Sequence, residues 1–83
     1  MNLIDRLNKI TTVKDIDDQI RLAKQYMMRL RKEAKAKPTL DEKLVTQQKA
    51  KAAELTLRKL RMRSFDIEDA LKTGNYQPEQ FSA

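Results

Sequence analysis

The chain has 83 residues, of which 36% are charged, and a formal net charge of +6. A chain this short forms one domain with a thin core, because it buries only about 60–65% of the surface that it exposes when unfolded. It contains no cysteine and no histidine, and only one glycine. Disulfides, thiolate or imidazole metal sites, the commonest catalytic bases and glycine-rich phosphate loops are therefore excluded. We therefore expect that the protein is not an enzyme and that it binds no cofactor and no small-molecule substrate.

The apolar residues are too dispersed for a membrane protein. The longest apolar run is three residues, at positions 26–28. A membrane span needs about 20 apolar residues, and the core of a signal peptide needs at least seven or so. We therefore expect no membrane contact and a cytoplasmic protein, or one of the host cytoplasm or virion if a phage encodes it.

The predicted elements are all helices. A first helix, about 2–10, begins at Asn2 and places Leu3, Leu7 and Ile10 on one side. Thr12, followed three residues later by Asp15, indicates the start of a second helix, about 13–37. This helix carries an unbroken 3-4 heptad seam: Val13, Ile16, Ile20, Ala23, Met27, Leu30 and Ala34. It must end at Lys37, because proline at position 38 disfavours a helical conformation in the residue before it.

A third helix, about 39–63, begins at the capping pair Thr39 and Glu42. Its apolar residues form two stripes. One contains Ala50, Ala53, Leu57 and Leu60, and the other contains Leu40, Leu44, Leu55 and Met62. Two stripes are wider than one neighbouring helix can cover. A fourth helix, about 65–73, ends at Gly74, so residues 1–74 form one helical domain. Residues 75–83 are a tail or docking arm with Tyr76 and Phe81.

The short link at Pro38 requires the second and third helices to pack antiparallel. We therefore predict an all-α fold: a helical hairpin with short flanking helices, bundle-like or coiled-coil-like, and oligomeric or partner-bound. The expected facing pairs are Ile16–Leu60, Ile20–Leu57, Ala23–Ala53 and Met27–Ala50. The same pairing places three acids, Asp15, Asp17 and Asp18, beside three arginines, Arg58, Arg61 and Arg63.

The first candidate site is the apolar surface that remains when the hairpin closes. It comprises the second stripe of the third helix, two residues beside the seam and two aromatic tail residues: Leu40, Leu44, Leu55, Met62, Leu22, Tyr26, Tyr76 and Phe81. One alternative is that the chain covers this surface itself. In that case the first helix and the apolar residues Phe65, Ile67 and Leu71 would fold back over it. The other alternative is a protein partner or a second copy.

The second candidate site is the group of basic residues toward the hairpin turn: Lys24, Arg29, Arg31, Lys32, Lys35, Lys37, Lys43, Lys49 and Lys51. Lysine and arginine on rigid helices can neutralise phosphates without reading the base sequence. Only one aromatic residue, Tyr26, lies near them, which disfavours single-strand binding by base stacking. The alternative is an ordinary solvated surface.

We therefore expect a non-catalytic interaction or assembly protein that binds itself, a larger protein, or both. The alternative function is sequence-nonspecific nucleic-acid binding by the basic faces of the hairpin. Hairpins of this size occur among bundle-forming regulators, adaptors, and accessory proteins of phage and plasmid type, and likeness of fold does not choose among these.

Overall fold

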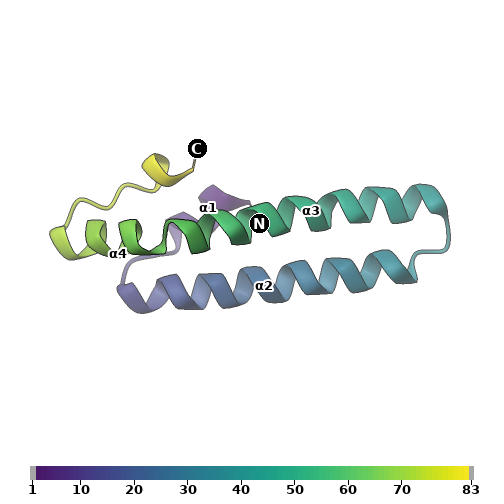
Figure 1. Ribbon diagram of the computed structural model, residues 1–83, viewed down its shortest axis with the longest axis horizontal. Coiled ribbons are helices and arrows are strands. Elements are labelled where there is room, and N and C mark those ends of the chain that lie inside the picture. The colour runs from purple at the N-terminus through teal and green to yellow at the C-terminus, as the bar shows by residue number, and fades with distance from the viewer. Residues whose placement is uncertain (1, 83) are drawn as a thin grey trace.

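The computed structural model of the protein describes residues 2–82. Two long helices, α2 (Val13–Ala36) and α3 (Leu40–Met62), pack antiparallel as the predicted hairpin (Figure 1). The shorter elements α1 (Leu3–Asn8), α4 (Ser64–Thr73) and the 3-10 helix η1 (Pro78–Phe81) lie toward the end opposite the turn. No strand occurs in this part of the chain. The molecule is elongated, with extents of 50 × 21 × 17 Å.

The helix boundaries follow the predicted capping residues. Asn2, Thr12 and Thr39 each accept a hydrogen bond from the backbone N–H three residues later. These side chains satisfy N–H groups that have no partner within the helix. Gly74 ends α4 with a φ of +75°, a left-handed conformation that glycine adopts without a steric penalty. The first helix is shorter than predicted, because the chain leaves the helical path after Asn8.

The hairpin core consists of the residues predicted for the α2–α3 interface. The buried members are Ile16, Ala23, Met27, Leu30, Ala34, Ala50, Ala53, Leu57 and Leu60. Ile20 is half-buried against them. Val13, predicted in the same seam, is exposed because it is the first residue of α2, at the rim of the bundle. Which residue of α2 lies directly opposite which residue of α3 stays a prediction.

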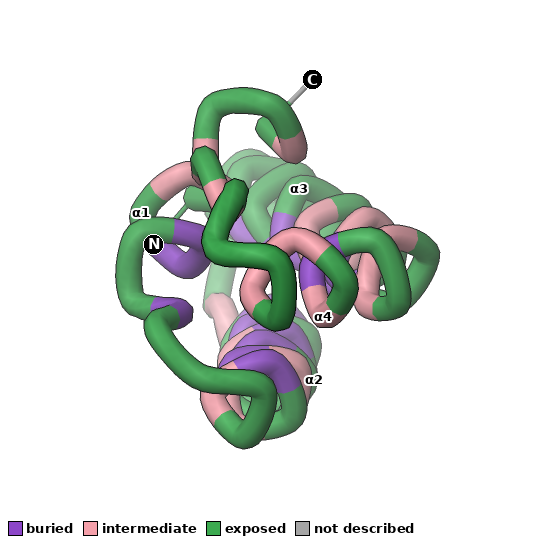
Figure 2. Tube along the Cα trace, turned by 90° about the vertical axis from the view of Figure 1, so that its left-hand side faces the viewer, coloured by how far each residue is buried: buried purple, intermediate pink, exposed green. Residues whose placement is uncertain are grey.

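A second part of the core joins α1, α3 and α4 at the base of the hairpin. Leu7, Ile10, Leu60 and Ile67 are almost completely buried there, and Figure 2 shows the buried segments of the elements turned toward one another. Phe65, expected to cover the hairpin, is exposed instead. It lies two residues before Ile67, so the helical period turns it about 160° away, and both side chains cannot face the core.

The C-terminal segment docks on its own chain. Its 3-10 helix packs against α1, and the Tyr76 hydroxyl donates a hydrogen bond of 2.6 Å to the backbone oxygen of Leu7. The rings of Tyr76 and Phe81 stack with centroids 5.8 Å apart. The Leu7 oxygen also accepts a hydrogen bond of 3.2 Å from the backbone N–H of Ile10, so Tyr76 is a further donor to it. The residues predicted as a tail or docking arm therefore secure α1 to the bundle.

This docking is expected to fail at high pH. Burial raises the pKa of Tyr76 to about 12, and nearby Glu79 acts in the same direction. In the unfolded chain the pKa of tyrosine is about 10. The folded state therefore holds the proton more tightly, and its contribution to stability is complete below about pH 10 and lost as the pH rises toward 12.

The check is a thermal melt of wild type and Tyr76→Phe across this pH range, with Tyr26→Phe as the control. We expect wild type and the control to lose an increment of stability that Tyr76→Phe does not lose. Parallel pH profiles of all three proteins would show that the Tyr76 hydroxyl does not couple the tail to the fold.

Candidate functional site

An apolar stripe runs along the side of α3 that faces away from α2. We call Leu40, Leu44, Leu55 and Met62 the α3 stripe; their exposed fractions lie between 48% and 73%. At about 100° per residue the stripe lies roughly 160° around the helix from the buried face. The helix α1 does not cover it, because its N-cap Asn2 shares a hollow with Ala52 and Thr56 on another side of α3. The expected alternative of self-covering by the chain ends is therefore wrong for these four residues.

Three of the four stripe residues belong to a heptad pattern within α3. Positions 44, 48, 51, 55, 58 and 62 are spaced alternately by four and three residues. Leu44, Leu55 and Met62 are the apolar members, and the polar members between them are Gln48, Lys51 and Arg58. This spacing is that of a coiled-coil seam with polar interruptions. It is wide enough to contact one more helix.

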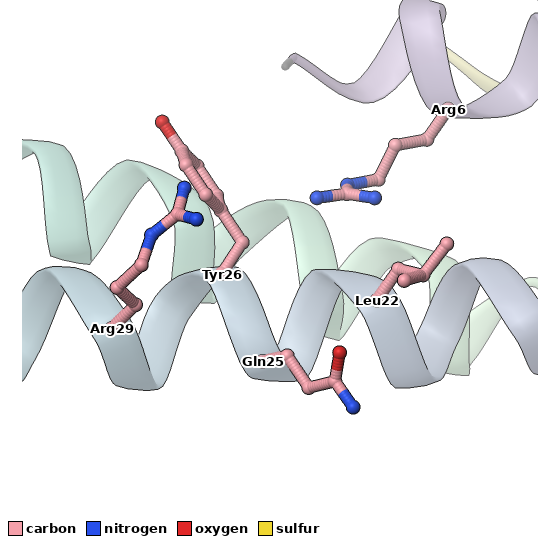
Figure 3. A pocket seen from close by; sticks show the side chains of 5 residues that line it. All are labelled: Arg6, Leu22, Gln25, Tyr26 and Arg29. Carbon is pink, nitrogen blue, oxygen red and sulfur yellow. The ribbon is translucent and has the colours of Figure 1, made fainter.

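The other predicted apolar pair, Leu22 and Tyr26, lines a pocket between α1 and α2. The pocket has a volume of about 470 Å³, and its other lining residues are Arg6, Gln25 and Arg29 (Figure 3). Tyr26 stands between the two guanidinium groups, with centroid distances of 5.8 Å to Arg6 and 5.2 Å to Arg29. The aromatic face attracts both cations.

Arg6 is the most unusual charged residue of the protein, because it is only 4% exposed. Its Nη1 donates a hydrogen bond of 3.2 Å to Oε1 of the buried Gln19. Burial lowers the pKa of Arg6, and the charge of Tyr26 opposes this effect. The amide oxygen and the aromatic face thus compensate a buried cation and fix α1 on α2.

Sequence reasoning did not single out Arg6 and Gln19. A signal was present, since Arg6 lies three residues after Leu3 and four before Ile10, on the apolar side of its helix. Of the tail residues predicted to bind a partner, Tyr76 and Phe81 are instead half-buried against the core.

The basic residues of the second candidate site lie at the surface. Seven of the nine are exposed, and Lys37 and Lys43 are half-buried. The helical period spreads them around the hairpin, with Lys43 and Lys49 on opposite sides of the buried face of α3. Two of them have acidic partners: Arg31 pairs with Glu54 across the hairpin at 3.3 Å, and Arg29 approaches Glu33 at 3.9 Å. The nine residues are therefore distributed around the hairpin and do not form a single cationic face. We call them the basic collar.

The acids at the start of α2 act locally. The Oδ2 atom of Asp15 accepts hydrogen bonds from the backbone N–H groups of Thr11 and Thr12, which lower the pKa of Asp15. Asp18 pairs with Arg21 on its own helix at 3.5 Å. These two acids therefore serve the start of α2, where we expected them to neutralise the arginines across the hairpin.

No family model, curated protein or solved structure matches the chain. Within residues 2–82, no group of three or more acidic, histidine or cysteine side chains is placed to hold a metal ion. In the same part of the chain, no helix has the length and apolar character to cross a membrane.

Proposed function

We propose that the protein is a non-catalytic helical interaction and assembly protein, which binds copies of itself, a larger protein, or both. The observation that supports this proposal is the exposed α3 stripe. The core residues of α3 are packed on its opposite side, and the stripe lies outside that core. Exposed apolar residues that align along a helix are characteristic of interaction surfaces, whereas scattered ones are ordinary.

The test is size-exclusion chromatography with light scattering on protein purified from cells. We expect either a mass above the 9.7 kDa of one chain or a second protein that co-purifies in fixed proportion. A monodisperse monomer that carries no second protein would contradict the proposal.

The second candidate function is sequence-nonspecific nucleic-acid binding by the basic collar. Its support is the net charge of +6 together with the exposure of most of the collar. Binding of this kind would weaken steeply with salt, by a slope of about 0.9 for each phosphate contact on a logarithmic plot.

Charge reversal near the turn tests this second function. If it is correct, we expect Lys32, Lys35 and Lys37 replaced together by Glu to abolish binding to a labelled duplex, measured by fluorescence anisotropy. A charge-matched control replaces Lys9, Lys14 and Lys72, which lie at or near the other end, by Glu. No duplex binding by wild type, or equal loss in both triple variants, would remove site-directed nucleic-acid binding as a function.

A further inference from the structure

We propose that the α3 stripe is occupied by the α3 stripe of a second copy of this chain, packed antiparallel. This inference rests on the proposed function and names the partner at that surface. Three features of α3 support it: the spacing of the stripe, the distribution of charge along the helix, and the exposure of the stripe residues.

The spacing is close to palindromic about residue 53. A two-fold axis there would place Leu44 opposite Met62, Gln48 opposite Arg58, and Lys51 opposite Leu55 of the second copy. Apolar residues thus meet apolar residues at both ends. In the middle, the aliphatic part of Lys51 can cover Leu55 while its ammonium group stays in water. A two-fold contact uses the same patch on both copies, so such self-matching spacing is what it requires.

The charges of α3 favour the antiparallel orientation. Its first turn carries Asp41 and Glu42 against one cation, Lys43, whereas its last two turns carry three cations, Arg58, Lys59 and Arg61, and no acid. Antiparallel packing brings the acidic end of each helix beside the basic end of the other. Parallel packing would place like charges together. The helix dipoles oppose parallel packing for the same reason.

The stripe is long enough for such a contact and is open along its length. From Leu44 to Met62 it covers about two and a half heptads, or roughly 27 Å of helix at 1.5 Å per residue. The helix α1 contacts a different side of α3, near Ala52 and Thr56. The tail packs on α1. Within residues 2–82 the stripe residues are 48% to 73% exposed, so a second copy can approach them without displacing a described segment.

The first experiment compares two variants by sedimentation velocity over a range of concentrations. Leu55→Lys places a cation in the middle of the stripe, opposite Lys51 of the second copy. Val45→Lys is the matched control, because Val45 is an apolar residue of the same helix with similar exposure, 53% against 48%, and lies outside the stripe. We expect wild type and Val45→Lys to form dimers of twice 9.7 kDa. We expect Leu55→Lys to raise the dimer dissociation constant by on the order of a hundredfold or more, because it places like charges face to face in the contact.

The second experiment determines the orientation by disulfide cross-linking, which is clean because the chain has no cysteine. In an antiparallel dimer, position 44 of one copy lies beside position 62 of the other. We expect the double variant Leu44→Cys and Met62→Cys to form a covalent dimer on mild oxidation, and Leu44→Cys alone to form little. Efficient cross-linking of Leu44→Cys alone would show a parallel dimer and overturn the proposal.

The outcomes also separate this inference from the proposed function. A monomeric chain that co-purifies with a larger protein would overturn the inference and support the function. A monomer without any partner would overturn both. A dimer that Val45→Lys dissociates and Leu55→Lys does not would keep the assembly function and exclude the α3 stripe as its surface. Circular dichroism of both variants verifies that each remains helical.

Discussion

Replacing Leu57 by Asp is expected to lower the free energy of unfolding by about 4–6 kcal/mol. Loss of a buried leucine costs about 2–5 kcal/mol, and a carboxylate at this site would also have to be buried or protonated. Leu57 is 4% exposed and belongs to the α2–α3 core. A domain of this size has a total stability of roughly 4–12 kcal/mol. We therefore expect Leu57→Asp to be largely unfolded near physiological temperature, as measured by urea denaturation followed by circular dichroism.

The matched control is Val45→Asp, on the same helix but 53% exposed. Valine and aspartate have similar helix propensities, so we expect a change within about 1 kcal/mol. Lys32→Glu, an exposed charge reversal on α2, should be equally mild, whereas Ala23→Glu should be severe because Ala23 is buried in the same core. Similar denaturation midpoints for all four variants would mean that the α2–α3 interface does not hold the fold together.

The second large effect is expected at Ile67 of α4. Its side chain has no exposed surface, and it packs in the part of the core that joins α1 and α4 to the hairpin. Truncation to alanine should cost about 2–5 kcal/mol, because it removes buried methyl groups and leaves a cavity. We expect Ile67→Ala to lower the midpoint of chemical unfolding and to increase amide hydrogen exchange in α4 more than in the hairpin.

Phe65→Ala provides the control, since it removes a larger side chain from the same helix. Phe65 is 77% exposed, so the loss should be within about 0.5 kcal/mol when the protein is dilute enough to be monomeric. If Phe65→Ala were the more destabilising variant, α4 would pack on the hairpin through the other side, and the position of Ile67 would be wrong.

Sequence reasoning succeeded where the determinants are local. The caps at Thr12 and Thr39, the break at Pro38 and the stop at Gly74 act within a few residues, and the structure confirms each helix that they delimit. The heptad seam of α2 can be buried by a single neighbouring helix. Because the link between α2 and α3 is short, α3 must be that neighbour.

The candidate site was predicted only in part. The exposed α3 stripe could be found from the sequence, because the helical period separates it from the buried face of the same helix. The pocket beside Tyr26 could not, since two of its features depend on α1 crossing α2: the buried position of Arg6 and its hydrogen bond to Gln19. The only indication in the sequence was that Arg6 lies on the apolar side of α1. A charged residue in a short helix is normally expected to be solvated, so this position did not predict burial.

By itself, then, the sequence determined the helices, their antiparallel pairing and the two-sided character of α3, because periodicity, caps and turns act over short stretches of chain. Only the tertiary structure decided what the chain ends do. Tyr76 and Leu7 are 69 residues apart, and no local pattern encodes their hydrogen bond. That contact holds the tail on α1, and the start of α1 lies beside Ala52 of α3, where Asn2 and Ala52 line one hollow. The α3 stripe is left uncovered by the chain's own packing, and its sequence carries the spacing and charge that suit a second copy.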